Sequence, residues 1–320
     1  MAIIRTHQKT MKLSIVIPIY NESKLLDVLL KRFETAIDCV SENDVEFLLI
    51  NDGSTDDSLQ ILCAFCETRP QFKCLNLTRN HGHQLAITAG IYHAIGDAVA
   101  VIDGDLQDPP EFINALYKKM QEGYDVVYAV REKRNGESFF KKATASVFYK
   151  LLSRVSSTSI PRNTGDFRIM SRRVVETFKQ FPERQRFIRG LISWIGYKQT
   201  GILYTRDARY AGKTHYSFPK MCRLAWDAIT SFSAIPLRLI SYLGLLTALS
   251  GFLFALYILY LKFNTTETIQ GWTSLMMVVL ILGGVQLLSL GVIGEYLGSI
   301  HTESKKRPLF MIEGIYESKS

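Results

Sequence analysis

The chain has 320 residues, 47% of them hydrophobic, which is enough for one sizeable α/β domain and a further apolar region. The formal net charge of +8 favours an anionic partner, but zinc-finger spacing, basic repeats and aromatic nucleic-acid motifs are missing, which argues against nucleic acid. Five cysteines, an odd number set in apolar patterns, favour reduced thiols of a cytoplasmic domain over a disulfide framework. The N-terminal tail, residues 1–11, lacks the apolar run of a signal peptide.

Apolar runs that alternate with amphipathic helical segments fill the first 131 residues. This alternation predicts parallel strands joined by helices, which is a Rossmann-like, mostly parallel α/β sheet. The predicted strands cover residues 13–20, 45–50, 73–78, 99–102 and 125–130.

A polar cluster directly follows each predicted strand. The clusters are residues 20–22, 51–52, 79–80, 103–105 and Arg131. In an open parallel sheet, ligands bind outside the carboxyl ends of the strands, so these side chains are expected at one edge. Turn chemistry explains Asn, Asp and Gly at such places, but it does not require two arginines or paired acids. We therefore predict an active site at this edge.

The acidic stretch after the fourth strand offers a metal site. Asp103 and Asp105 stand one residue apart at a strand end, and the Gln107 amide adds a further oxygen. Oxygen ligands suit Mg²⁺ or Mn²⁺, and no His or Cys lies nearby in sequence to favour zinc. Such ions share substrate phosphates, so a diphosphate is the expected ligand. The alternative is a solvated acidic turn. Asp108 and Glu111 are expected to form an N-cap with its capping box at the next helix.

Two common nucleotide motifs are missing. The first strand is not followed by G-x-G-x-x-G, and the chain has no G-x-x-x-x-G-K-[ST]. Neither a dinucleotide-binding fold nor a P-loop is therefore indicated.

Six ordered motifs carry a family resemblance: IVIPIYNE, INDGSTDD, TRNHGHQ, DGDLQDPPE, VREKRNGE and TGDFRIMSRR. Together with PERQRFIRGLISWIGY, they resemble the inverting GT-A glycosyltransferases that use polyprenyl phosphate, among them dolichyl-phosphate mannose synthases and bactoprenol glucosyltransferases. The likeness extends from residue 13 to residue 308. Two positions depart from it: His81 stands where Phe is usual, and His215 stands where Lys is common, which leaves one phosphate contact open.

The resemblance implies roles for the residues at the strand ends. It implies that Asp103, Asp105 and Gln107 position a divalent cation, Mg²⁺ or Mn²⁺, which neutralises the charge of a UDP leaving group. It places the nucleotide sugar against Pro18, Tyr20, Glu22, Asp52, Arg79, Gln84, Asp103 and Gly104.

The segment 163–168 is expected to be a turn between helices, and the resemblance puts the catalytic base at Asp166. A phosphate monoester is largely ionised near neutrality, since its second pKa is about 6. We therefore favour an orienting role for Asp166, with Arg168 fixing its carboxylate, over base catalysis or a helix cap. The resemblance places Arg131, Arg209 and Lys213 at the acceptor phosphate, and the two arginines can grip it bidentately.

Residues 239–262 and 273–298 are each long and apolar enough to cross a bilayer. Lys and Arg flank this pair and are missing from its loop, so the positive-inside rule puts the catalytic domain and both termini in the cytoplasm, at the cell inner membrane. Residues 218–238 mix apolar and basic side chains, as in amphipathic helices on the lipid surface. The predicted parts are a tail at 1–11, a GT-A domain at 12–217, juxtamembrane helices at 218–238, a two-helix hairpin at 239–300 and a tail at 301–320.

The expected activity is transfer of a sugar from a nucleotide sugar, with UDP-glucose favoured, to polyprenyl (undecaprenyl) phosphate. The product would be a lipid-linked donor for O-antigen or cell-wall glycan modification, and the resemblance implies a homo-oligomer, a tetramer. Alternatives are a mannose or amino-sugar transferase, a non-catalytic membrane anchor, and a flippase or channel. A processive synthase would normally carry Q-x-x-R-W and more spans.

Overall fold

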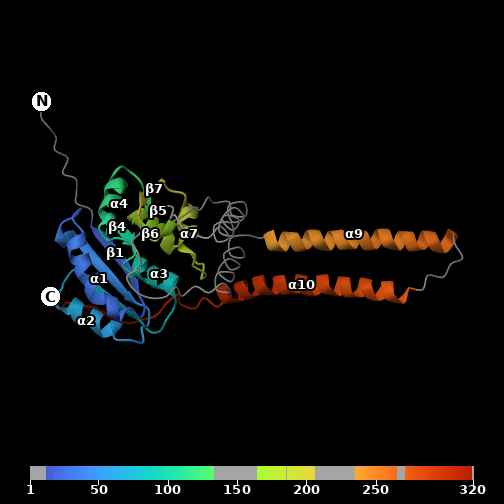
Figure 1. Cartoon of the computed structure of the whole chain (residues 1–320), viewed down its shortest axis with the longest axis horizontal. Helices are drawn as coiled ribbons and strands as arrows, with labels where there is room; N and C mark the ends of the chain where they lie inside the picture. The colour runs from blue at the N-terminus through green and yellow to red at the C-terminus, as the bar shows by residue number, and fades with distance from the viewer. Residues whose placement is uncertain (1–11, 133–163, 185, 206–234, 265–270, 319–320) are drawn as a thin grey trace, which may run out of the picture. The chain divides into compact units, whose positions relative to one another are not determined.

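The computed structural model describes residues 12–132, 164–184, 186–205, 235–264 and 271–318. The described residues fall into two compact units (Figure 1). The first unit contains residues up to 205 and the C-terminal residues from Arg307 onward, and the second contains the two long helices between them. The chain therefore leaves the first unit and later returns to it.

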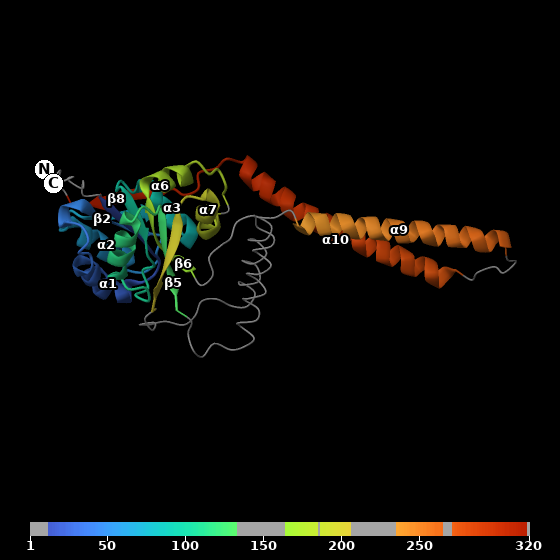
Figure 2. The same cartoon turned by 90° about the horizontal axis from the view of Figure 1, so that it is seen from above.

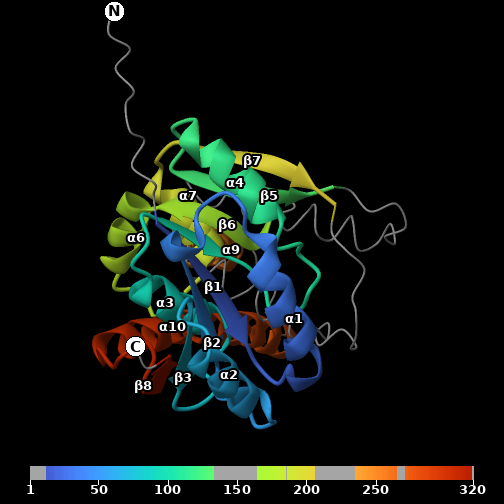
Figure 3. The same ribbon diagram turned by 90° about the vertical axis from the view of Figure 1, so that its left-hand side faces the viewer.

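An eight-stranded sheet is the centre of the first unit. Its order is β7-β5-β6-β4-β1-β2-β3-β8. Figure 3 shows β7, β5 and β6 toward the top of the view and β2 and β3 toward the bottom. The strands are β1 (Leu13–Ile19), β2 (Val45–Asn51), β3 (Phe72–Leu77), β4 (Ala98–Val101), β5 (Val126–Arg131), β6 (Thr164–Ser171), β7 (Gln199–Tyr204) and β8 (Ile312–Glu317).

The sheet is mostly parallel, as expected. Strands β1 to β5 and β7 run in one direction, while β6 and β8 run in the other. All seven residues of β1 are buried because helices cover both faces of the sheet, which explains its nearly continuous apolar sequence.

The expectation of a turn at 163–168 was wrong. Most of this segment lies in β6, which enters antiparallel between β4 and β5.

Helices cover both faces of the sheet (Figure 2). Helix α3 lies directly against β1. Gly90 allows this close approach, since a Cβ atom at this position would stand 2.2 Å from Cγ1 of Val16. The core of the opposite face contains Leu29 and Phe33 of α1, packed with odd-numbered residues of β1. The helices of this unit are α1 (Ser23–Ala36), α2 (Ser58–Glu67), α3 (His83–His93), α4 (Phe112–Gln121), α6 (Arg172–Lys179) and α7 (Ile188–Ile195), with a short 3-10 turn at Glu42–Asp44.

The capping box expected at Asp108 and Glu111 does not form. Helix α4 begins at Phe112, and its N-cap residue, Glu111, makes no side-chain cap hydrogen bond. Glu111 instead accepts two hydrogen bonds from Arg32, at 2.8 and 2.9 Å. Asp108 is buried and bonds elsewhere, as described below.

The sequence suggested a tail at the C-terminus, but residues of this segment form a strand of the sheet. Strand β8 pairs antiparallel with β3, and Glu313 accepts a hydrogen bond of 2.9 Å from the buried Asn76 amide. Just before β8, the Met311 carbonyl accepts from the Thr78 N–H at 3.0 Å, and Phe310 lies edge-on to Tyr92. The short sequence IEGIYE has too little alternation to stand out after a long helix, which is why it was missed.

The second unit is described by the helices α9 (Ile235–Asn264) and α10 (Trp272–Ser304), which lie side by side (Figure 1). Within the described residues, one stretch, Ile281–Ser304, meets the length and composition of a membrane span, with a mean hydropathy of 1.4. Leu239–Phe254 is a shorter apolar helical stretch. Most of the expected juxtamembrane segment, 218–238, lies outside the described residues.

Candidate active site

The acidic loop after β4, residues 102–108, packs against the end of β1. A Cβ atom at Gly104 would stand 2.9 Å from the carbonyl oxygen of Pro18, so a glycine allows the two segments to approach. Within the loop, Leu106 has a φ of 58°, and the Asp105 carboxylate accepts the Gln107 N–H at 3.1 Å. The loop therefore has a defined backbone path that brings Asp103 to the carboxyl end of the sheet.

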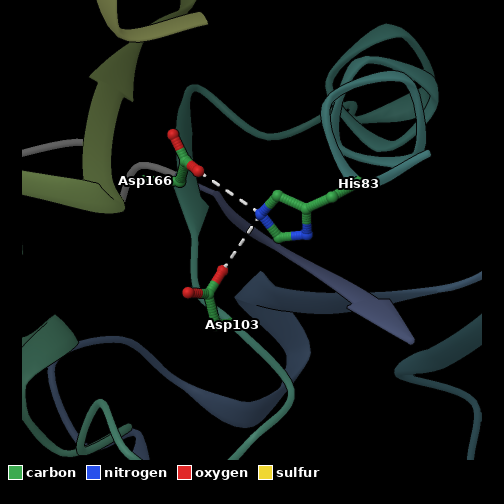
Figure 4. Close-up of side chains that lie close together, drawn as sticks. All are labelled: His83, Asp103 and Asp166. Atoms are coloured by element: carbon green, nitrogen blue, oxygen red, sulfur yellow. Dashed lines mark hydrogen bonds and ion pairs between the residues drawn. The ribbon is translucent and has the colours of Figure 1, made fainter. Parts of the chain in front are cut away.

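The side chain of Asp103, from this loop, meets those of His83 and Asp166, which come from two other elements (Figure 4). The Nε2 atom of His83, at the start of α3, lies 3.3 Å from Oδ2 of Asp166 and 3.4 Å from Oδ1 of Asp103. The antiparallel register explains the meeting: Val101 of β4 pairs with Arg168 of β6, so two residues further along Asp103 comes level with Asp166. The His83–Asp103–Asp166 cluster has its possible ligand atoms within 4.8 Å of one another.

Negative charge accumulates in this cluster. Burial and the neighbouring Asp166, Asp108 and Asp105 carboxylates raise the pKa of Asp103 to about 6, although His83 opposes the shift. Burial disfavours the charged form of His83, but its hydrogen bond to Asp166 and the nearby Asp103 outweigh burial and raise its pKa. Two carboxylates and an imidazole whose ligand atoms lie within 4.8 Å of one another form a donor set that fits a divalent metal.

The fold changes one premise of the metal prediction. No histidine is near Asp103 in sequence, but His83 is near it in space. Among the His, Cys, Asp and Glu side chains of the described residues, those grouped with Asp103 are His83 and Asp166, and Asp105 is not in the group. Gln107 is buried, and Asp105 holds the main chain of the loop.

Asp166 receives hydrogen bonds from three side chains. Arg189 donates through Nε and Nη2, at 2.9 and 3.1 Å, and Gln84 donates at 3.0 Å. His83 adds the contact at 3.3 Å. The carboxylate is buried, which alone would raise its pKa, but Arg189 and these hydrogen bonds hold the pKa of Asp166 well below its usual range.

Arg168 does not hold the Asp166 carboxylate, contrary to expectation. Its guanidinium donates to the main-chain oxygens of Gly165 and Asp166, at 2.9 and 3.2 Å. Burial lowers the pKa of Arg168 to about 10, despite the favourable charge of Asp166. Arg168 therefore supports the backbone of β6, and Arg189 holds the Asp166 carboxylate in the role that was expected of Arg168.

Asp52 organises the loop that leads to His83. Its two oxygens accept the main-chain N–H groups of His81 and Gly82, at 2.7 and 2.9 Å. Gly53, with a φ of 63°, lies so close to the same loop that a Cβ atom would overlap the Arg79 backbone. Burial raises the pKa of Asp52, even though both N–H groups favour the carboxylate.

The other residues assigned to the nucleotide sugar divide into exposed and enclosed groups. Tyr20 and Arg79 are exposed just after β1 and β3, and Glu22 is half-buried at the start of α1. Pro18 is buried within β1. Gln84 is engaged at both ends of its amide, with Asp166 and with the N–H of Ile188 at 3.0 Å. It therefore joins β6 to α7 in this structure.

Arg131 lies at the end of β5, near the Asp166 strand. Its Nε donates to the Tyr204 hydroxyl at 3.2 Å, and Nη2 lies 3.7 Å from the Asp108 carboxylate. Burial opposes its charge, but Asp108 and Tyr204 together raise the pKa of Arg131. The other two residues expected at the acceptor phosphate, Arg209 and Lys213, lie outside the described residues.

Three functional candidates were missed from the sequence: His83, Arg189 and Tyr204. The first two lie in the motifs TRNHGHQ and PERQRFIRGLISWIGY, and the motifs were the available signal. Tyr204 ends β7 and carries no local motif. The structure brings Asp103 and Gln84 to Asp166, a meeting that the sequence did not predict.

Comparison with known proteins shows the family of the chain. Residues 14–178 match the family model Glycosyl transferase family 2, and residues 235–300 match the GtrB C-terminal hairpin. An uncharacterized glycosyltransferase of Bacillus subtilis is 50% identical over 95% of this chain and 94% of its own. A bactoprenol glucosyl transferase of Shigella phage SfV is 42% identical over 95% and 98%. A prophage bactoprenol glucosyl transferase homolog of Escherichia coli is 40% identical over 95% and 99%.

Proposed function

The chain belongs to glycosyl transferase family 2, and on that basis we propose that it transfers glucose from UDP-glucose to a polyprenyl phosphate. The observation that carries the proposal is the meeting of Asp103, Asp166 and His83 at the carboxyl end of a GT-A-like sheet. Relatives named as bactoprenol glucosyl transferases, 40–42% identical over nearly the whole chain, support the acceptor and the sugar.

Residues around the acidic loop would hold the donor. Asp103, together with His83 or with Asp105 and Gln107, would bind Mg²⁺ or Mn²⁺, which supplies positive charge to the diphosphate leaving group. Tyr20, Glu22, Asp52 and Arg79 would border the nucleotide, because each follows a parallel strand at the same edge.

The transfer step needs little proton chemistry. An oxygen of the acceptor phosphate would attack the anomeric carbon while the bond from that carbon to the nucleotide diphosphate breaks. The phosphate is already ionised near neutral pH, since its second pKa is about 6. Asp166, fully engaged by donors, would orient the reacting groups, and Arg131 would bind the acceptor phosphate together with Arg209 and Lys213.

The apolar helices suggest where the acceptor is found. Residues 235–300 match a hairpin model named for GtrB, and α10 contains a stretch that meets the composition of a membrane span. We place the enzyme at the inner membrane as a homo-oligomer with two spans, the sheet domain in the cytoplasm and the lipid phosphate at the membrane surface. The Lys and Arg flanking the hairpin support this topology.

A single reconstitution tests the proposal. The full chain in vesicles that contain undecaprenyl phosphate is given UDP-glucose, UDP-N-acetylglucosamine or GDP-mannose, each radiolabelled in the sugar. The expected result is label in the lipid fraction with UDP-glucose, and loss of this label when EDTA removes divalent cations. Transfer only from another donor would contradict the sugar assignment, and no transfer from any donor would contradict the activity.

A further inference from the structure

Arg189 and Asp166 form a two-point ion pair at the centre of the site. The guanidinium presents Nε to one carboxylate oxygen and Nη2 to the other, at 2.9 and 3.1 Å. Such parallel hydrogen bonds fix the plane of a carboxylate as well as its position. The Asp166 side chain is 2% exposed and that of Arg189 is 32% exposed, so the pair is enclosed on the Asp166 side.

The backbone that carries Arg189 is itself held in place. Gln84 accepts the N–H of Ile188 and donates to Asp166, so one amide fixes both the start of α7 and the carboxylate. Ile188, Leu191 and Ile192 are buried, and α7 ends at Gly196 in a left-handed conformation. Arg189 therefore projects toward Asp166 from a helix that is packed into the core, not from a loop.

The pair has an electrostatic role that the neighbouring acids define. Asp103 and Asp166 both approach His83, so two carboxylates share a small space in which Asp166 is buried and Asp103 is partly buried. Without a fixed cation on its far side, Asp166 would turn away from Asp103, because the two carboxylates repel one another. The two hydrogen bonds from Arg189 hold the Asp166 carboxylate in one orientation.

We propose that Arg189 is a positioning residue that fixes the Asp166 carboxylate beside Asp103, and that it thereby sets the rate of sugar transfer without governing nucleotide-sugar binding. This inference rests on the proposed function, because it concerns the same transfer step. Arg189 acts through Asp166, and no bond to Arg189 forms or breaks during the reaction.

The chain offers a matched control. Arg173, on α6, uses the same Nε and Nη2 atoms to grip both oxygens of Asp125, which precedes β5. The Arg173 side chain is 61% exposed, and neither residue belongs to the site. Replacing Arg173 removes an equivalent ion pair from the fold and leaves the acidic loop intact.

The experiment compares Arg189→Lys, Arg189→Gln, Arg173→Lys and Arg173→Gln in the full chain, reconstituted with undecaprenyl phosphate and UDP-glucose. We expect Arg189→Gln to lower kcat by about 10²-fold, as misplacement of a reacting group does, with the KM for UDP-glucose within twofold of wild type. Arg189→Lys, which keeps the charge and one hydrogen bond, should fall between. Both Arg173 variants should keep kcat within twofold.

A double-mutant cycle with Asp166→Asn tests whether the loss of kcat in Arg189→Gln depends on Asp166. If Arg189 acts through Asp166, Arg189→Gln should lower kcat far less in the Asp166→Asn background than in wild type. Independent effects, a change in KM alone, or an equal loss in Arg173→Gln would overturn the inference. Should Arg189→Gln fail to fold, as its thermal unfolding would show, wild-type kcat in Arg189→Lys would also overturn it. An inactive wild-type enzyme would instead overturn the proposed function.

Discussion

The hydroxyl of Tyr204 donates a hydrogen bond of 2.5 Å to Oδ1 of Asp108. Tyr204 is the last residue of β7, an edge strand, while Asp108 belongs to the acidic loop, so the bond joins this loop to the edge of the sheet. Arg131 completes this arrangement through its hydrogen bond to Tyr204. The loop is thus held at β1 by close packing and at β7 by a buried polar contact.

Tyr204→Phe should destabilise the protein and loosen this loop. The substitution removes a donor from a buried carboxylate, which costs about 1–3 kcal/mol in the free energy of unfolding. Because the same loop carries Asp103, the KM for the nucleotide sugar should rise. Thermal unfolding and steady-state kinetics measure the two effects. Tyr124→Phe is the control, since its ring faces Lys119 and Lys198 instead of a carboxylate. Equal behaviour of the two variants would contradict the argument.

Asp103→Asn should abolish sugar transfer and leave a folded protein. Removing one carboxylate relieves repulsion in the acidic cluster but also removes a cation ligand. In wild type, Mn²⁺ at about 100 times its Kd should add about 2.7 kcal/mol to the free energy of unfolding. Asp103→Asn should lose this gain, while the surface variant Glu122→Gln should keep it. Thermal unfolding with Mn²⁺ and with EDTA measures the difference. Full transfer activity in Asp103→Asn would exclude the metal role.

Asp56 should make the stability depend on acidic pH. Its carboxylate accepts the N–H groups of Ser23 and Ser58, the first residues of α1 and α2, each at 3.1 Å. Partial burial opposes the charge, but these hydrogen bonds and the two serine hydroxyls lower the pKa of Asp56 to about 2. A lowered pKa in the folded state stabilises the fold above the unfolded value near 3.8, and this contribution fades as the pH falls toward 2.

The test compares wild type with Asp56→Ala. At pH 7 the variant should be less stable by about 1 kcal/mol, as for loss of a helix cap. The difference in unfolding midpoint should shrink between pH 4 and pH 2 as Asp56 of the wild type takes up a proton. A difference that stays constant or grows over this range would show that the carboxylate charge is not the cause.

Gly165→Ala should affect the acceptor more than the donor. A Cβ atom at this position would lie 2.6 Å from Nη2 of Arg131, so the guanidinium would have to move. Gly165 is buried and the Arg131 guanidinium is held by Tyr204 and Asp108, so the free energy of unfolding should fall by about 1–3 kcal/mol, as when a buried polar group loses a partner. If Arg131 binds the acceptor phosphate, the KM for undecaprenyl phosphate should rise several-fold, with the KM for UDP-glucose unchanged. A rise in the KM for UDP-glucose alone would argue against that role.

The central strands could be predicted because their signals are local. Runs such as Leu13–Ile19 and Val45–Asn51 are buried on both faces and read as continuous apolar stretches bounded by polar turns. Strand β6 could not, because Asp166 and Arg168 place charges in its buried face. Their partners come from Arg189 and from the main chain of the strand itself, and such compensation appears only when the chain is folded.

For the site, the sequence could predict the location at the strand ends but not the contacts between the side chains. The rule that ligands bind at strand ends led to the prediction of a site around Asp103 and Asp52, and the structure brings His83 and Asp166 to Asp103 there. It did not reveal that His83 lies between Asp103 and Asp166, because that contact depends on the antiparallel register of β6 against β4. Nor did it show that both oxygens of Asp52 hold main-chain N–H groups.

Strand β8 has a consequence for biosynthesis. Its partner β3 is made early, yet Glu313 and Asn76, which are hydrogen-bonded, are separated by 237 positions in the chain. An unpaired edge strand is a template for association with other chains. The outer edge of β3 therefore lacks its partner strand until Ile312–Glu317 has been synthesised, which happens after both apolar helices. Nascent chains that stall before this point would expose that edge to one another and to chaperones.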